Sequence, residues 1–442
     1  MINEHVYSRP WPLGQKVVFR FLFIYFLINI LSFSYFTDRP YLSLLSGAHN
    51  YIINRIVFAF NNHVMHLGGK VINFYNNDDT HFRLVQMVLY VVVALTGTVI
   101  WGIIQRKQPS HNIARYWLKT LIRYFVALVS IIYGSVKLYA FQATFPTLSS
   151  MATPLGNFLP QELFWRYMGY SPFYQIFSGV MEVSVAVLLL YRRTATLGAV
   201  IGLMVYTNVL MINMLYDVRV KVFTMHLIAM CLYLLVTDGK RLVDFFILNR
   251  PVAYARDHFI PAKKRIKIVR LVLKSLFIIN GMYYVLAFYS QYKEYTDLEK
   301  QDLKPIPYGL YEVRLFVKNN DTLPVLANDS LIWKDVVFEY NQKKNFATVN
   351  SRDTLLGHGN RRGLFYYKAD TLAKTLQCYR EENKDSVYLF TMQYYIKDRN
   401  NIALRAKVGE DSLYMELMRS KRKFKLAERQ FHWVSEGNRV GE

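Results

Sequence analysis

The chain has 442 residues, of which 53% are hydrophobic and 16% aromatic, and its formal net charge is +23. This length and apolar content exclude a single small soluble domain, because the chain can bury far more apolar surface than one small domain needs. The charge does not indicate a nucleic-acid partner. Residues 1–288 hold 28 Lys and Arg against 10 Asp and Glu, and most of that excess flanks long apolar runs, as membrane topology requires.

Seven apolar runs are predicted to be membrane helices, because most of them are long enough to cross a hydrocarbon core of about 30 Å as α-helices, so the lipid bilayer is the first predicted partner. The first run is not followed by a small-residue cleavage pattern, and we expect it to be retained. The runs lie at about 17–36, 84–105, 122–143, 173–191, 196–216, 222–237 and 269–288.

Basic residues alternate between the connections. Nineteen Lys and Arg lie before the first run, in every second connection, or within the first four residues of the run that follows, whereas the other connections hold seven. By the positive-inside rule the N-terminus is cytoplasmic, and seven crossings then place the C-terminal part outside the cytoplasm. Cys231 lies in the sixth run and Cys378 in the C-terminal part, so we expect no disulfide between them.

The connection between the first two runs carries a possible metal site. His63 and His66 are spaced i, i+3, and Asp78, Asp79 and His81 follow. Imidazole and carboxylate groups are common ligands of Zn²⁺. Imidazoles also occur at membrane interfaces without a metal, so both interpretations stay open.

Polar residues in four of the runs fall in the same half of the bilayer. At 1.5 Å per residue, Lys137 lies about 12 Å below the outer end of the third run, and Glu182 about 15 Å below that of the fourth. By the same count Asn208 lies about 12 Å down in the fifth run and His226 about 7 Å down in the sixth. A charge facing lipid costs about 3 kcal/mol or more, so these groups are expected to face one another or a polar cavity.

Lys137 and Glu182 are the candidate catalytic residues, because a buried pair of opposite charges can exchange protons with a ligand. The structural alternative stays open, since such pairs often only fix helix packing and an intramembrane Asn often serves as an interhelical hydrogen-bond donor. The candidate ligand-binding residues lie around the pair and at the charged outer turn "YDVRVK"; they are Tyr133, Asn208, Asp217, Lys221 and His226.

Beyond residue 300 the pattern changes to short alternating runs such as "YEVRLFVK", which predict β-strands. Eight or nine antiparallel strands indicate a small closed barrel or a sandwich, whose interior either binds a lipophilic molecule or is filled by side chains. Gly309 and Tyr311, with the late Arg429, resemble lipocalin-like barrels, in which an arginine packs across an early aromatic ring. The predicted strands are 308–318, 331–340, 344–350, 363–368, 373–380, 386–396, 402–408, 412–419 and 423–434.

The phrases "RYFVALVSIIYGSVKLYAFQ", "WRYMGYSPFYQIFSGVMEV", "LLLYRRTATLG", "TNVLMINMLYDVRVKVF" and "TDGKRLVDFFILN" resemble the DoxX family of bacterial inner-membrane proteins. The resemblance covers residues 118–250 and implies a four-helix core in the bacterial inner (plasma) membrane. Arg219 stands where the family pattern leads us to expect a small residue or proline. The resembling phrases contain Lys137, Glu182, Arg192, Arg193, Asn208, Asp217 and Lys221.

The family is named after a subunit of a thiosulfate:quinone oxidoreductase, so the resemblance implies a quinone cofactor and a soluble redox partner that supplies electrons. A non-enzymatic alternative stays open, in which the helices anchor a β domain that captures a lipid or an envelope partner. The expected fold is a bundle of about seven transmembrane helices followed by an extracytoplasmic antiparallel β-barrel or sandwich. The expected parts are 1–117 (helices one and two), 118–250 (the DoxX-like core), 251–299 (a basic segment and helix seven) and 300–442 (the β domain).

Overall fold

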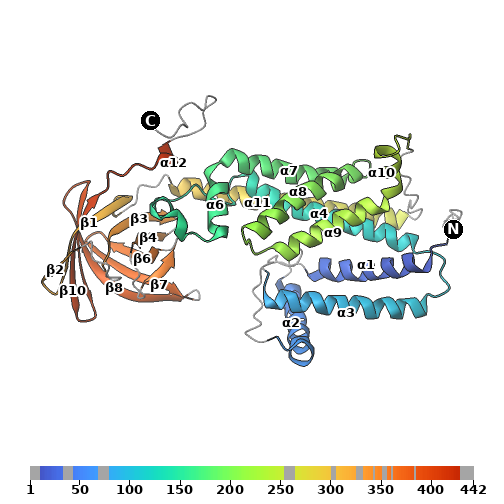
Figure 1. Ribbon diagram of the computed structural model, residues 1–442, viewed down its shortest axis with the longest axis horizontal. Helices are drawn as coiled ribbons and strands as arrows, with labels where there is room; N and C mark the ends of the chain where they lie inside the picture. The colour runs from blue at the N-terminus through green and yellow to red at the C-terminus, as the bar shows by residue number, and fades with distance from the viewer. Residues whose placement is uncertain are drawn as a thin grey trace. The chain divides into compact units, whose positions relative to one another are not determined.

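The structure is a computed structural model that describes residues 10–32, 43–67, 79–252, 264–299, 305–324, 332–341, 344–350, 356–359, 362–382 and 385–428. The chain forms two compact units (Figure 1). The helical unit comprises Met1–Ala143 and Ser171–Ser290, and the β unit comprises Thr144–Tyr170 and Gln291–Glu442.

The helical unit contains long apolar helices, as the sequence predicts. Among the described residues, α1, α3, α4, α7 and α8 are long and apolar enough to cross a membrane, and α9 with α10, bent by 73°, would make a sixth span. The seventh predicted run lies within the helix α11, whose crossing of the bilayer stays a prediction. The bounds are α1 Leu13–Ser32, α2 Ser43–Phe60, the π-helix Asn61–Met65, α3 His81–Ile104, α4 Asn112–Leu138, α7 Pro172–Leu190, α8 Ala195–Leu215, α9 Lys221–Thr237, α10 Gly239–Phe246 and α11 Lys264–Glu299.

α4 is the central helix of this unit. About two thirds of its apolar window (67%) is buried, a larger share than in any other of the five candidate spans. Ile122, Phe125 and Leu128 are fully buried in the core that α4 shares with α1, α7, α8 and α9. Polar side chains on α4 are therefore directed at other helices, and this fixes where Lys137 can find a partner.

The β unit contains a closed antiparallel barrel, which confirms the barrel prediction and excludes the sandwich. Eight strands follow one another around the barrel in the order β1, β3, β4, β6, β7, β8, β9, β10, and β10 pairs with β1 to close it. The short strands β2 and β5 add to β1 and β6. The bounds are β1 Gly309–Lys318, β2 Asp321–Leu323, β3 Asp335–Asn341, β4 Lys344–Val349, β5 Gly357–Gly359, β6 Arg362–Asp370, β7 Thr375–Glu382, β8 Asp385–Ile396, β9 Asn401–Val408 and β10 Asp411–Arg419.

Inward-pointing side chains fill the barrel. Tyr311, Phe338 and Phe365 are fully buried in one apolar cluster, and the Trp333 ring stacks on Phe365 at 5.8 Å between centroids. This packing favours the interpretation in which side chains, rather than a ligand, occupy the interior. Cys378 belongs to the same cluster, and it and Cys231 are both free and buried, which confirms the prediction of no disulfide.

The end of the barrel differs from the prediction in two respects. A ninth strand over 423–434 is wrong, because Lys425–Glu428 forms the helix α12; residues after 428 lie outside the described part of the chain. The arginine across the early aromatic ring is Arg419 of β10. A Cβ added at Gly309 would lie 3.2 Å from Arg419 Nε and 3.3 Å from the Tyr311 ring, and Arg419 Nη2 donates to the Tyr308 carbonyl at 3.2 Å. Arg429 lies outside the described residues.

The connection between α4 and α7 belongs to the β unit. It contains α5 (Leu148–Ala152), a 3-10 turn (Leu155–Asn157) and α6 (Pro160–Tyr170), and α5 packs on β1 and β3. Glu339, on the outer face of β3, is 4% exposed, and its Oε1 accepts from the Ser149 N–H at 3.3 Å. Arg166 of α6 interacts electrostatically with Glu339. Burial raises the pKa of Glu339.

Candidate functional site

Two glycines bring α4 and α7 into close contact. A Cβ added at Gly134 would lie 2.7 Å from Val183 Cγ2 and 3.1 Å from the Gly179 carbonyl oxygen, and a Cβ at Gly179 would lie 2.8 Å from the Gly134 oxygen. Neither position has room for a larger side chain. In both "GSVK" (134–137) and "GVME" (179–182) a charged residue follows three positions later, one helical turn along the same face.

The predicted ion pair forms at this crossing. Lys137 Nζ lies 2.6 Å from Glu182 Oε1, and the two side chains are 7% and 3% exposed. The ammonium also lies 5.8 Å from the centre of the Tyr133 ring, within the range of a cation–π interaction. The structure therefore confirms that these opposite charges share a level and face each other.

The ion pair with Lys137 engages only one oxygen of the Glu182 carboxylate, Oε1. Its Oε2 is buried and has no hydrogen-bond partner among the described residues. A buried carboxylate oxygen without a donor is unfavourable, so a hydroxyl, an N–H group or a water reaching it would be bound favourably. Nearby, Tyr206 of α8 shares a 2.6 Å hydrogen bond with Ser130 of α4 and interacts electrostatically with Glu182.

Asn208 does not join this group. The expectation that it faces inward is wrong, because Asn208 lies at an exposed position of α8. The buried amide on that helix is Asn213, which is 3% exposed and donates from Nδ2 to Thr224 Oγ1 on α9 at 2.9 Å. Counting residues gives the depth of a residue along a helix, but it does not tell which face of the helix packs against its neighbours. For this reason the sequence led to the wrong asparagine.

His226 is buried, as expected, but it pairs with a helix that the sequence argument did not consider. Its Nε2 lies 2.8 Å from the Tyr25 hydroxyl of α1, and its Nδ1 lies 2.7 Å from the Val222 carbonyl. A carbonyl only accepts, so Nδ1 carries the hydrogen and Tyr25 donates to Nε2. Tyr25 carried no signal beyond its place in an apolar run.

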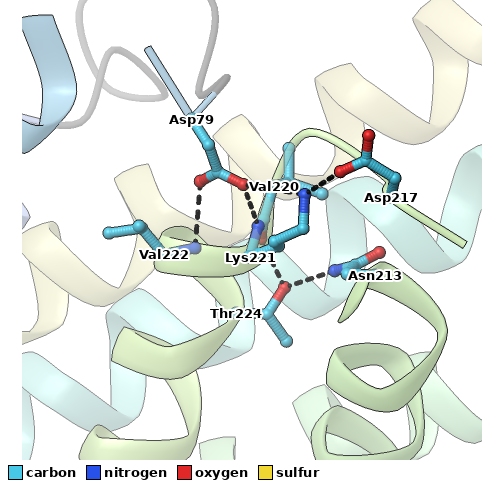
Figure 2. A network of polar contacts seen from close by, with 7 residues as sticks. All are labelled: Asp79, Asn213, Asp217, Val220, Lys221, Val222 and Thr224. Carbon is cyan, nitrogen blue, oxygen red and sulfur yellow. Dashed lines mark hydrogen bonds and ion pairs between the residues drawn. The ribbon is translucent and has the colours of Figure 1, made fainter. Parts of the chain in front are cut away.

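The turn between α8 and α9 is held from a distant part of the chain. Both carboxylate oxygens of Asp79 accept backbone N–H groups at the start of α9, from Lys221 at 2.7 Å and from Val222 at 3.0 Å (Figure 2). This arrangement caps the helix and complements its dipole. No local pattern in the sequence could have linked residues so far apart.

Asp217 and Lys221 pair with each other at this turn. Their side chains are 2.7 Å apart, and the nearby ammonium holds the pKa of Asp217 below its usual value. Asp217 has a φ of 53° and ends α8 in the left-handed conformation, with the Val218 N–H donating to the Asn213 carbonyl at 3.0 Å. The Asp217 side chain is 81% exposed. Ligand binding by the two residues stays a prediction.

The possible metal site does not assemble in the part of the chain that the structure describes. There, no three His, Cys, Asp or Glu side chains are grouped as a metal would require. His66 follows the π-helix in a left-handed conformation, and Asp79 is engaged at α9. Asp78 lies outside the described residues.

Comparison with known proteins adds one partial relative. No family model and no solved structure matches the chain. A stretch of 82 residues, 19% of the chain, is 42% identical to "Uncharacterized protein YwoB" of Bacillus subtilis (strain 168) and covers 53% of that protein. The chain thus spans about half the length of this curated relative, whose name states no activity. Function must be argued from the site.

Proposed function

We propose that the protein is a DoxX-like component of a quinone-linked oxidoreductase in the bacterial inner membrane, in which Lys137 and Glu182 exchange protons with the quinone head group. The observation that carries this proposal is the buried Glu182 Oε2, an acceptor without a donor beside a paired ammonium. Its chemistry fits a hydroxyl donor of the reduced head group. The helices that hold the pair, α4 and α7, are long and apolar enough to cross a membrane, in which a quinone would be dissolved.

Each residue has a defined role in this proposal. A quinone supplies two-electron chemistry coupled to the uptake of two protons. With a quinone bound, Lys137 Nζ would donate a hydrogen bond to an oxygen of the head group and would supply one of the two protons, the second coming from water. Glu182 Oε2 would accept a hydrogen bond from a hydroxyl of the reduced head group, and Tyr133 holds the ammonium in place through its ring. Electrons come from a soluble redox partner.

A second function is favoured by a different observation. Lys137 and Glu182 bind each other, and a cavity found beside His226 among the described residues has a volume of only about 10 Å³. This suits a non-enzymatic protein in which the pair fixes helix packing and the β unit captures a lipid or an envelope partner. Because the barrel interior is filled by side chains, such a partner would bind its outer surface.

The test compares purified wild type with Lys137→Met and Glu182→Gln. We expect quinone to co-extract with the wild type and to be reduced there, as measured by absorbance, and both variants to lose bound quinone while remaining folded. Lys119→Met is the matched control, since it breaks another ion pair, Lys119 with Asp238 at 3.5 Å, elsewhere in the same unit. Quinone absent from every sample would reject the enzyme and favour the binding protein.

A further inference from the structure

A small cavity lined by both polar and apolar side chains lies between α1, α3 and α9 in the helical unit. Its volume is about 10 Å³, which is room for about one water molecule. A cavity of this size holds water only when polar groups line it. Its lining includes Asn29 of α1, Arg83, Gln86 and Tyr90 of α3, and Phe223 and His226 of α9.

The lining groups are ordered by hydrogen bonds that leave capacity for a water. Arg83 Nη1 donates to Gln86 Oε1 at 2.6 Å, and Gln86 Nε2 donates to the Tyr90 hydroxyl at 2.8 Å. Asn29 Nδ2 donates to the Tyr25 carbonyl at 2.8 Å. Each of these amide nitrogens carries two hydrogens and uses one in the bond named, so the second hydrogen of each can reach a water in the cavity.

The cavity lies at the end of the helices where Asp79 caps α9. Arg83 is in the first turn of α3, and Phe223 and His226 are in the first two turns of α9. The capped N–H groups of Lys221 and Val222 belong to the turn of α9 that carries Phe223. The cavity thus lies within two helical turns of the α8–α9 connection, from which we expect water to reach it.

One aromatic contact separates the cavity from the ion pair. Phe223 lines the cavity, and the centre of its ring lies 6.1 Å from that of Tyr133. The centre of the Tyr133 ring lies 5.8 Å from Lys137 Nζ. Movement of these two rings would join the cavity water to the ammonium.

We propose that this cavity is the port through which water and protons reach Lys137 and Glu182 from the side of Asp79, with Phe223 and Tyr133 as the barrier. A proton that leaves Lys137 Nζ, or that Glu182 Oε2 takes up, is exchanged with the cavity water, which re-equilibrates with bulk water. The inference rests on the proposed function, because a pair that exchanges protons with a head group must be resupplied. Gln86 is a positioning residue that holds the water.

The experiment measures hydrogen exchange at the Lys137 ammonium in the full chain without quinone. The protein carries ¹⁵N-labelled lysine in detergent micelles, and the Lys137 signal is identified by its loss in Lys137→Met. Phe223→Ala should speed exchange by about tenfold, equivalent to about 1.4 kcal/mol of barrier. Gln86→Leu, which replaces a polar wall by an apolar one, should slow exchange by a similar factor. Unchanged rates in both variants would overturn the proposal.

Two further variants make the result specific. Phe277→Ala also removes a buried ring, one that contacts Tyr124 at 5.0 Å far from the pair along α4, and it should leave exchange unchanged. Gln142, after the end of α4, has a buried Oε1 without a partner among the described residues, and its substitution tests an alternative route for water. If Gln142→Leu slows exchange and Phe223→Ala does not speed it, the port lies there and the proposal fails.

The outcome is independent of the test of the proposed function. Hydrogen exchange at Lys137 is measured in quinone-free protein. If Phe223→Ala speeds this exchange, the proposal of the port is supported even when no quinone is found. Conversely, quinone can be bound and reduced in a protein whose exchange ignores Phe223 and Gln86. In that case the proposed function stands and the port is rejected.

Discussion

The buried ion pair sets the energetics at the scale of single residues. Removing one partner leaves an uncompensated charge, and such changes cost about 3–5 kcal/mol, whereas replacing both partners by apolar groups of similar size is often neutral or stabilising. Lys137→Met and Glu182→Leu should therefore each lower the thermal unfolding temperature in detergent. The double variant should recover most of the loss. A double variant as unstable as the sum of the two would show that Lys137 and Glu182 do not interact.

Glu339 gives the β unit a predictable pH dependence. Burial raises its pKa in the folded state above the usual 4.5, so the folded protein holds this proton more tightly than the unfolded chain. The resulting stability is fully present below about pH 4.5 and is lost as the pH rises through the raised value. We expect Glu339→Gln to flatten the fall in stability with pH over that window, measured by thermal unfolding at several pH values. If the unfolding temperature falls with pH as steeply in Glu339→Gln as in the wild type, ionisation of Glu339 does not destabilise the folded protein.

The same scale shows what the sequence could and could not provide for the site. Counting residues along helices placed Lys137 and Glu182 at one depth, and the structure joins them. The count failed for Asn208 because it does not tell which face of α8 is buried. Asn213, five residues further on, lies about 140° further round the helix, on the face that packs against α9. Partners from distant helices, such as Tyr25 for His226, depend on packing that no local pattern records.

At the scale of elements, the glycines at the α4–α7 crossing determine whether the site exists. Gly179→Ala would place a Cβ 2.8 Å from the Gly134 oxygen and 2.9 Å from the Leu138 nitrogen, both backbone atoms that cannot move without shifting a helix. We expect the variant to unfold at lower temperature, by about 1–3 kcal/mol of stability, as overpacked sites do. Gly14→Ala in α1 is the control, because nothing lies within 4 Å of its Cβ position. Equal behaviour of the two variants would contradict the close crossing.

The strands were predictable because alternation along a strand reflects one buried and one outer face. The ninth predicted strand failed for a reason that only the closed barrel reveals. Since β10 pairs with β1, neither of these two strands is left as an open edge of the barrel for a following strand. The residues Lys425–Glu428 have good helix propensity, and they form α12 instead.

At the scale of the whole molecule, the two units constrain how often the chain crosses the membrane. Residues 144–170 connect α4 to α7 and belong to the same compact unit as the barrel, so both must lie on one side of the bilayer. Three candidate spans lie between them in the chain, namely α7, α8 and the bent pair of α9 and α10, and three crossings alone would separate them. A fourth crossing by α11 restores the even number, and this supports the predicted seventh span. The contact of Asp79 with the start of α9 also requires an even number of crossings between them. Four candidate spans, α3, α4, α7 and α8, lie between them in the chain.

An even number of crossings between the two parts of the β unit fixes on which side of the membrane three exposed positions should lie. We expect Leu155→Cys in the α4–α7 connection and Leu372→Cys in the β6–β7 turn, 70% and 96% exposed, to react with a membrane-impermeant maleimide added to intact spheroplasts. Lys240→Cys in α10 should react only after lysis, because α9 separates α10 from the Asp79 side. The buried Cys231 and Cys378 are left in place, and the unsubstituted chain measures their background. If Leu372→Cys reacts only after lysis, as expected of Lys240→Cys, while Leu155→Cys reacts in intact spheroplasts, α11 does not cross the bilayer.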